Sequence, residues 1–440
     1  MSLRPPETVG KLQQTLHEKA KAQPTYRFYA LYDKLYRKDI LAYAWAICRA
    51  NGGKPGVDGE TFEQIEQMGV ESWLQAVAEE LRGKTYEPEA VRRVYIPKPN
   101  GKQRPLGIPT IKDRVVQTAA VIVLNPIFEA DLCDEQYAYR EGRSAHGAVR
   151  KIHHWISIGH REVVDADLSG YFDTIPHAEL MKSLARRISD GAMLKLLKMW
   201  LRMPVEETGP KGGGRRMNPA KKTRRGTPQG APVSPLLSNL YMRRFILGWK
   251  QLGWEAKLGA KIVNYADDFV ILCKTGGAEA GEAMRRIMDK LKLTVNEEKT
   301  KVCRLPEERI VFLGYEIGRC YSPRTGKAFW GTRPSQKSIS RITREVSALT
   351  RSNRVLLGTE AVVGAINQKL VGWGNYFSLG AASKAYRRVD LHTRYRLRRW
   401  LCRKHKIPGQ GTRMFPDQRL LGELGLVSLQ NRPRMHAYAR

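Results

Sequence analysis

The pattern of apolar and polar residues predicts a protein that mixes helices with short strands. Apolar residues recur at helical spacing over residues 26–50, 65–81, 113–128 and 278–291. Short apolar runs bounded by Gly, Pro, Asn or Asp separate these segments, a pattern typical of strands and turns. From residue 333 onward the spacing becomes helical. The sequence therefore predicts an α+β fold with a helical part near its C-terminal end.

Two of the predicted strands carry acidic residues at their ends. Residues 262–272 hold Asp267 and Asp268 between two apolar runs, which predicts a β-hairpin with Ala266 and both acids at its turn. Another predicted strand ends upstream at Asp167. Neighbouring strand residues point to opposite faces, so Asp267 and Asp268 are not expected to bind one metal ion equally. Acids from two strand ends can form a two-metal site for phosphoryl transfer; a surface Asp-Asp turn is the alternative.

A second predicted hairpin is basic. Two strands flank Asn100 and Gly101, a dipeptide typical of tight hairpin turns. Lys98, Lys102 and Arg104 lie on this hairpin, where they can contact a triphosphate. The alternative is that they are solvated charges on an exposed hairpin.

Residues 205–226 form a glycine-rich, strongly basic insertion. We expect it to be mobile and to follow a phosphate backbone, with a plain solvated loop as the alternative. Residues 227–239 then join a turn stiffened by Pro and Gly to a predicted helix. Gln229 lies in this turn, where its amide can meet a substrate.

The charge of the chain points to a polyanionic partner. Its 440 residues contain 76 Lys and Arg against 43 Asp and Glu, a formal net charge of +33. Nucleic acid is favoured over a membrane, because the apolar run at residues 119–124 is too short to span a bilayer. The first residues lack the apolar core of a signal peptide, so we expect a cytosolic protein. Six dispersed cysteines without a CxxC pair argue against a zinc ribbon or a disulfide framework.

The C-terminal quarter carries much of this charge. Residues 331–440 hold 22 Lys and Arg against 5 Asp and Glu, interleaved with aromatic residues. Cations beside aromatic rings suit RNA binding, in which the rings stack on unpaired bases and the cations neutralise phosphates. A solvated helical face is the alternative. The candidate RNA-binding residues are Arg394, Arg396, Arg398 and Arg399.

Taken in chain order, several motifs resemble those of group II intron-encoded reverse transcriptases, also called maturases. They are YADD at 265–268, TPQGAPVSPLLSN at 227–239, DLSGYFD at 167–173, IPKP and RPLGIPT within 96–110, FLG at 312–314 and LVGWGNYF at 370–377. The resemblance implies a right-hand polymerase, with fingers and a palm built on an antiparallel sheet, and a helical thumb or maturase domain.

The resemblance also implies domain boundaries. We expect an N-terminal extension and the start of the fingers over residues 1–62, and reverse transcriptase fingers and palm over 63–330. The helical thumb or maturase domain is expected over 331–406, followed by a short C-terminal segment over 407–440.

The metal and catalytic residues follow from the same resemblance. Asp167, Asp267 and Asp268 are expected to bind two Mg²⁺ ions, for which Mn²⁺ is a substitute. Lys299 matches a lysine that donates a proton to the leaving pyrophosphate. These groups would activate the primer 3′-hydroxyl and stabilise the leaving group.

The resemblance assigns the nucleotide contacts as well. Lys98 and Arg104 would hold the incoming triphosphate, and Gln229 would touch the nucleotide. Phe172 would be the ring that rejects a 2′-hydroxyl by contact.

The implied function is an RNA-directed DNA polymerase that assists splicing of its intron RNA and copies it during retrohoming. Its implied partners are group II intron RNA, an RNA template with a DNA primer, target DNA and dNTPs, with no membrane. We expect a bacterial-type protein of the cytoplasm, associated with ribonucleoprotein or nucleoid. The sequence leaves open whether it is a monomer or a dimer.

Three departures from the family pattern stand out. The palm motif reads QGAP where many members have QGGP, which also brings it close to retron enzymes. The basic insertion is long, and we expect no HNH endonuclease domain. The alternatives are a domesticated group II-like or retron-like enzyme in phage defence or spacer acquisition, and an RNA-binding splicing factor with little polymerase activity.

Overall fold

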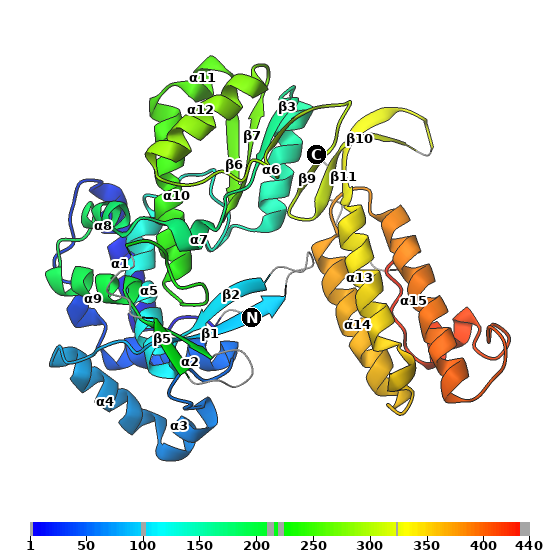
Figure 1. The fold of residues 1–440 in the computed structure, drawn as a ribbon, viewed down its shortest axis with the longest axis horizontal. Helices are drawn as coiled ribbons and strands as arrows, with labels where there is room; N and C mark the ends of the chain where they lie inside the picture. The colour runs from blue at the N-terminus through cyan, green and yellow to red at the C-terminus, as the bar shows by residue number, and fades with distance from the viewer. Residues whose placement is uncertain (1–2, 98–102, 209–214, 219–223, 323, 432–440) are drawn as a thin grey trace.

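The computed structural model describes residues 3–97, 103–208, 215–218, 224–322 and 324–431. Lys98 and Lys102 lie outside them. Figure 1 shows the palm at the top, the fingers at the lower left and the thumb helices at the right. Mixed helix and sheet confirms the predicted α+β class. No helix among the described residues is long and apolar enough to cross a membrane.

The palm is an antiparallel sheet with the strand order β6-β7-β3-β8. Successive strand residues face opposite sides, so Val163 packs into the core beside α6 while Val164 packs into the core beside α10 and α12. Burial on both faces explains why these strands read as continuous apolar runs. The bounds are β3 Glu162–Ala166, β6 Lys261–Tyr265, β7 Asp268–Cys273, β8 Lys301–Arg304, α6 Ala145–Ser157, α10 Ser234–Gln251, α11 Trp254–Lys257 and α12 Gly277–Lys290.

The fingers combine helices with a second sheet of order β2-β1-β4-β5. The predicted helix over 113–128 is confirmed as α5, which is buried along most of its length. The helices are α1 Glu7–Ala22, α2 Lys38–Asn51, α3 Phe62–Met68, α4 Val70–Arg82, α5 Ile111–Glu129, α7 Tyr171–Thr174, α8 His177–Ala185 and α9 Gly191–Leu201. The strands are β1 Val91–Pro97, β2 Gln103–Ile108, β4 Val205–Thr208 and β5 Arg215–Asn218.

The predicted helix over residues 26–50 is wrong in its first half. α2 begins only at Lys38, after a single 3₁₀ turn. The Asp190 carboxylate accepts hydrogen bonds from the backbone N–H groups of Leu31 and Tyr32, each 2.8 Å long. Because these groups are bonded to a distant segment, they are withdrawn from helical bonding.

The predicted helix over 65–81 is two helices, α3 and α4. They separate at Gly69, whose φ of +98° is outside the range of a right-handed helix. Thr61 and Gln64 form a capping box at the start of α3. The helical spacing therefore correctly predicted helix on both sides of Gly69, but it did not reveal that the helix is interrupted there.

The basic insertion is also corrected, because its described residues 205–208 and 215–218 are strands and not a loop. β4 pairs in parallel with β1, and β5 pairs antiparallel with β4, so the insertion enlarges the fingers sheet. The Tyr95 hydroxyl donates to Glu207 at 3.1 Å, and Arg93 lies 3.6 Å from the same carboxylate. These contacts hold the described part of the insertion on the basic hairpin.

The thumb consists of three long helices beside a third sheet of order β11-β10-β9. Trp373, Phe377, Tyr386 and Trp400 are buried in its core. The expectation that the aromatic rings of the C-terminal quarter stack on bases is therefore wrong for these four, whereas Tyr395 is 47% exposed. The bounds are β9 Ile310–Phe312, β10 Tyr315–Tyr321, β11 Ala328–Pro334, α13 Gln336–Leu349, α14 Thr359–Tyr376 and α15 Ser383–Lys404, with short turns η1 Tyr32–Lys34, η4 Ser352–Arg354 and η5 Arg419–Glu423.

Candidate polymerase active site

The predicted acidic hairpin is present at the edge of the palm sheet. Tyr265 at the end of β6 pairs with Asp268 at the start of β7, which leaves Ala266 and Asp267 as a two-residue turn. Ala266 has a φ of +58°, a conformation that two-residue hairpin turns require. The Asn264 amide donates to the Ala266 carbonyl at 2.8 Å and stabilises this turn.

Asp167 follows β3, which lies directly beside β7. Its carboxylate oxygen Oδ2 accepts from the Asn296 amide at 3.0 Å and from the Lys299 ammonium at 2.9 Å. Its backbone carbonyl accepts from the Asn296 N–H at 2.8 Å, and its own N–H donates to Thr300 at 3.3 Å. The segment around Lys299 therefore positions Asp167 beside the acidic hairpin.

The acids influence each other electrostatically. The pKa of the Asp268 carboxyl is raised to about 7, first because protein atoms separate it from bulk water and then because Asp267, Asp167 and Asp165 repel its charge. Lys299 acts in the opposite direction. Since Asp268 keeps exposed surface, repulsion among the acids is the stronger physical reason. Such a site favours the arrival of positive charge.

The acids fit a divalent cation by chemistry, because Mg²⁺ prefers carboxylate oxygens and several negative charges already lie close together. Among the described residues, no group of three or more His, Cys, Asp or Glu side chains converges on one metal position. Asp167 instead faces Asn296 and Lys299. The type of donor atom and the negative charge therefore fit the ion, and the Lys299 ammonium partly neutralises the Asp167 carboxylate.

A cavity of about 610 Å³ lies between fingers and palm. This volume falls within the roughly 300–1,000 Å³ of ligand sites, so a nucleotide-sized ligand fits. Arg104, Phe172 and Gln229, three of the predicted nucleotide contacts, all line it. Tyr139 lines it too. The pKa of Tyr139 is raised by separation from bulk water and then by the charge of Asp267, while Arg104 lowers it. Tyr139 thus connects the cavity to the acidic hairpin.

The cavity wall depends on a close approach between two motifs. The Gly107 N–H donates to the Gln229 carbonyl at 2.7 Å. Gly230 has a φ of +111°, and a Cβ there would lie 2.7 Å from the Gly107 carbonyl oxygen, so only glycine fits. Ala231 does not have a positive φ, and its side chain is buried. The QGAP variant of the motif is therefore compatible with this turn.

Phe172 and Gln229 are each fixed by a neighbour. The Phe172 ring meets Tyr171 edge to face, with centroids 5.7 Å apart, and it is half-buried. The Gln229 amide donates to Asp173 at 3.0 Å. Arg104 is exposed at the cavity.

The four candidate thumb arginines differ in their surroundings. Arg394 and Arg398 each lie 2.6 Å from the Asp417 carboxylate, and their side chains are mostly buried. Arg396 donates to the Thr350 hydroxyl and to the backbone carbonyls of Ser347 and Thr350, at the C-terminal end of α13. Arg399 is exposed to solvent and donates to the Tyr395 hydroxyl at 3.1 Å. Arg399 is therefore the best placed of the four to meet RNA, and the role of all four stays a prediction.

Comparison with known families decides what kind of protein this is. Residues 96–317 match the family described as "Reverse transcriptase (RNA-dependent DNA polymerase)", and residues 339–415 match "Group II intron, maturase-specific domain". The chain belongs to the group II intron-encoded reverse transcriptase family. The first match includes Asp167, Asp267 and the cavity residues Phe172 and Gln229, and the second includes most of the thumb helices.

Two curated relatives extend over much of this reverse transcriptase. Protein YkfC of Escherichia coli is 32% identical over 392 residues, which cover 80% of this chain and 100% of YkfC. Group II intron-encoded protein LtrA of Lactococcus lactis subsp. cremoris is 30% identical over 355 residues, covering 66% of this chain and 57% of LtrA. The chain thus spans little more than half the length of LtrA.

Among solved structures, a chain of a partial Cas6-RT-Cas1–Cas2 complex is 25% identical, with a TM-score of 0.35. The likeness covers 59% of this chain and 41% of that one, and it is too weak to carry an argument. Family membership makes the protein an RNA-directed DNA polymerase that depends on divalent metal ions. Its partners are intron RNA and a nucleic-acid template.

Sequence reasoning missed two residues of this reverse transcriptase site. Asn296 bonds Asp167 through both its backbone and its side chain; its place three residues before Lys299 was the available signal. Tyr139 is 53% exposed at the cavity and has a φ of +58°. Nothing in its local sequence pattern indicates that position, because only the fold brings it to the acids.

Proposed function

We propose that this reverse transcriptase copies its intron RNA into DNA by two-metal nucleotidyl transfer, and that it assists splicing and retrohoming of that RNA. One observation supports the proposal: Asp167 directly follows β3, the strand beside the turn that holds Asp267 and Asp268, and Tyr139, which feels the charge of Asp267, lines a nucleotide-sized cavity. Acids at strand ends beside a cavity are the arrangement that two-metal phosphoryl transfer needs.

Two Mg²⁺ ions, for which Mn²⁺ is the proposed substitute, would activate the primer 3′-hydroxyl and stabilise the leaving pyrophosphate. Asp167 and Asp267 are the proposed main ligands, and Asp268 is the proposed second acid of the hairpin. Lys299 now neutralises the Asp167 oxygen that a cation would take. With a cation held by Asp167, the Lys299 ammonium would no longer be needed there and could give a proton to pyrophosphate.

The proposed nucleotide contacts come from fingers and palm. Arg104 reaches the cavity from β2 and would hold the triphosphate, together with Lys98, which lies outside the described residues. Gln229 would contact the nucleotide and keep its geometry. Phe172 would lie beneath the sugar and exclude a 2′-hydroxyl.

The proposed substrates are dNTPs, an RNA template with a DNA primer, and target DNA. The proposed location is the bacterial cytoplasm, in a ribonucleoprotein or near the nucleoid, with no membrane partner. Whether the working form is a monomer or a dimer stays open in this proposal.

Substitution of Asp267 by Asn tests the catalytic assignment. Asp267→Asn removes one negative charge from the turn, so metal-dependent primer extension on RNA should be lost while RNA binding persists. The control is Asp289→Asn, which changes an exposed acid on α12. Primer extension at the wild-type rate by Asp267→Asn would show that the acids are misassigned.

The same experiment separates the alternatives. A splicing factor with little polymerase activity would support intron splicing without extending a primer. A domesticated enzyme in phage defence or spacer acquisition would extend a primer, but its gene would lack flanking nucleotides that fold into the catalytic hairpin of a group II intron.

A further inference from the structure

A second cavity lies between the thumb sheet and the thumb helices. It measures about 540 Å³, within the roughly 300–1,000 Å³ of ligand sites. We call it the outer groove. Strands β10 and β11 form one wall, and the first turns of α13 and α15 form the other. Its charged and aromatic lining residues are Arg309, Glu316, Arg319, Tyr321, Phe329, Arg333, Lys384 and Arg388.

The outer groove is strongly cationic. Five of the described residues that line it are Lys or Arg, against the single carboxylate of Glu316. Arg309 and Arg333 both bond that carboxylate, through one shared oxygen, at 2.9 and 2.5 Å. One negative charge is thus divided between two guanidinium groups, and positive charge remains for an anion. The N-terminal ends of α13 and α15 add to this field.

The same groove exposes aromatic rings. Tyr321 is 63% exposed and Phe329 is 43% exposed, so both rings can be reached by a ligand. The guanidinium of Arg319 lies over the Tyr321 ring, 5.8 Å from its centroid. Arg324 and Lys327, at the end of the β10–β11 hairpin, are also exposed. Phe329 pairs with Cys320 and therefore lies on the opposite side of the β10–β11 hairpin from Arg319 and Tyr321, but all three line the groove.

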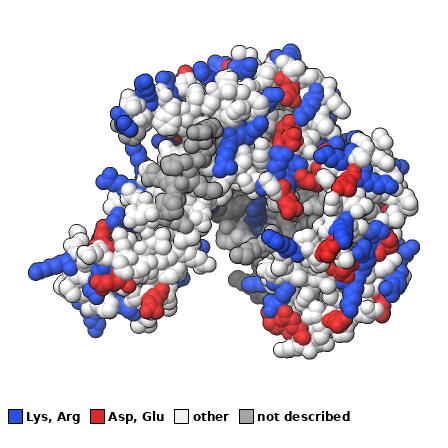
Figure 2. Space-filling model, turned by 180° about the vertical axis from the view of Figure 1, so that it is seen from behind, with Lys and Arg blue, Asp and Glu red and all other residues white. Residues whose placement is uncertain are grey.

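The outer groove is separate from the polymerase cavity. None of its lining residues lines the cavity that contains Phe172 and Gln229. In Figure 1, α15 lies on the side of α13 away from the fingers, and the β10–β11 hairpin projects in the same direction. Figure 2 shows open space between thumb and fingers, below the palm, where a template and primer would pass. A strand in the outer groove would instead follow the far side of the thumb.

We propose that the outer groove binds an unpaired segment of RNA, with phosphates on Arg319, Lys384 and Arg388 and a base stacked on Tyr321 or Phe329. Unpaired bases can leave a strand and stack on aromatic rings, whereas bases inside a duplex cannot. A simple anion would use the cations but would leave both rings exposed. The inference deepens the proposed function, because intron RNA is the proposed source of that segment.

The test uses the full chain, first loaded with an RNA template and DNA primer so that the polymerase cleft is occupied. The probe is a labelled, unstructured oligouridylate of roughly twelve nucleotides, within the span of known single-strand sites. Its affinity is measured at several salt concentrations, and primer extension and a melting curve are recorded for each variant.

Tyr321→Ala should weaken binding of the oligouridylate at least about fivefold, the lower range for loss of one base–aromatic stack. Tyr321→Phe, which keeps the ring, should bind as the wild type does, and Phe329→Ala provides a second exposed-ring variant. Arg319→Ala combined with Lys384→Ala should reduce the steepness of the salt dependence by about 1.4, since each cation contributes roughly 0.7 for single strands. Primer extension should not change.

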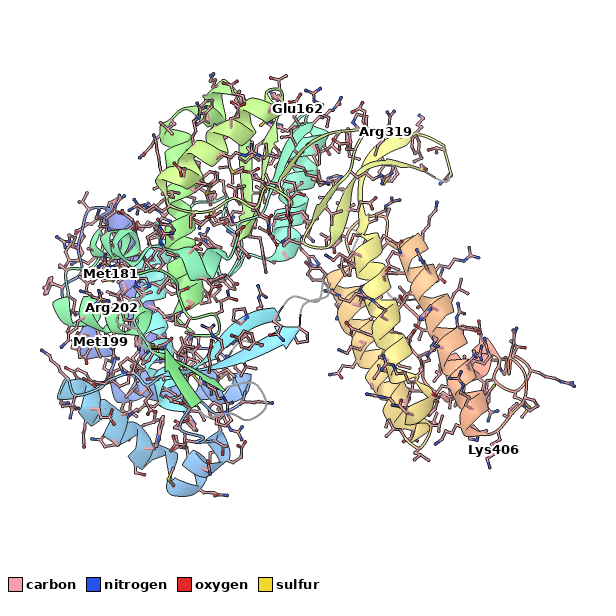
Figure 3. The ribbon with its side chains drawn as sticks, in the orientation of Figure 1. Glu162, Met181, Met199, Arg202, Arg319 and Lys406 are labelled. Atoms are coloured by element: carbon pink, nitrogen blue, oxygen red, sulfur yellow. The ribbon has the colours of Figure 1, made fainter. Side chains whose placement is uncertain are left out.

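The matched charge control is Lys195→Ala combined with Lys198→Ala, two exposed positions on α9. In Figure 3, Met199 and Arg202 mark that region, on the opposite side of the molecule from Arg319. The proposal is overturned if this control weakens binding as much as the groove variants, if neither ring variant weakens it, or if a duplex competes as well as the single strand. Loss of primer extension in Asp267→Asn is scored independently, so the groove and the proposed function can fail separately.

Discussion

At the scale of single residues, Phe172 shows how one side chain can serve two purposes. Its ring packs on the fingers core and on Tyr171, and it also lines the cavity. A steric wall discriminates strongly because the wrong substrate must overlap it, whereas lost apolar contact is worth only ~1–3 kcal/mol. The core contact and the proposed sugar contact therefore predict different effects of truncation.

Phe172→Val should increase the use of GTP relative to dGTP by at least about tenfold, or ~1.4 kcal/mol in transition-state terms. The measurement is the ratio of kcat/KM for dGTP over GTP on one RNA template, with a melting curve for each protein. A core role alone predicts a lower melting temperature and equal losses for both substrates. An unchanged ratio would thus refute the steric assignment.

At the scale of elements, the start of α5 is held by a buried acid. Asp113 accepts from the Tyr86 hydroxyl at 2.5 Å and from the Glu89 N–H at 3.1 Å, and Trp200 on α9 donates to the same hydroxyl at 3.2 Å. The N–H of Asp113 donates to Thr110, which caps α5. Burial raises the pKa of Asp113 to about 6, although its hydrogen bonds act in the opposite direction.

The raised pKa of Asp113 predicts a pH-dependent stability. The folded chain holds the Asp113 proton more tightly than the unfolded chain does. Protonated Asp113 therefore adds its full stabilisation to the folded chain below about pH 4, and this stabilisation is lost as pH rises through about 6. The loss should be on the order of 2 kcal/mol. Urea unfolding of wild type and Asp113→Asn between pH 4 and 7 measures it.

The Asn variant should be less stable at low pH, because its amide cannot replace every bond of the acid, but it should lack this part of the pH dependence. The control is Asp289→Asn, which should keep the wild-type slope. Identical pH profiles for wild type and Asp113→Asn would show that the acid is not protonated in this range.

At the scale of the whole molecule, the net charge of +33 favours a nucleic-acid partner, but folding decides which cations are available. Arg394 and Arg398 form ion pairs with Asp417 and hold it against α15, so their positive charge is partly neutralised within the thumb. Arg399 remains exposed on the same helix. Replacing all of these arginines together would therefore mix lost folding with lost binding.

We expect RNA affinity to fall steeply with salt, and Arg399→Ala to reduce the steepness by about 0.7–0.9 without changing the melting temperature. Arg398→Ala should lower the melting temperature, because it leaves Asp417 with one partner fewer. Filter binding over a salt series and thermal melting measure the two effects. A normal salt dependence in Arg399→Ala would place the RNA-binding surface elsewhere.

The sequence alone determined the features that depend on neighbouring residues. Two short apolar runs flanking the acids predicted the palm hairpin at Asp267, helical spacing predicted the helix α5, and the motifs indicated Asp167, Phe172 and Gln229. These features could be predicted because strand alternation, tight turns and helical faces are local properties of a chain.

The tertiary structure decided everything that depends on residues distant in sequence. Asp190 reaches the N–H groups of Leu31 and Tyr32 and prevents the helix that their spacing favours. β4 pairs with β1, so part of the basic insertion belongs to a sheet. Asp417 forms ion pairs with two of the arginines that the sequence assigned to RNA binding. A buried backbone group or a charge pairs with whichever partner the fold brings near, and local spacing does not contain that information.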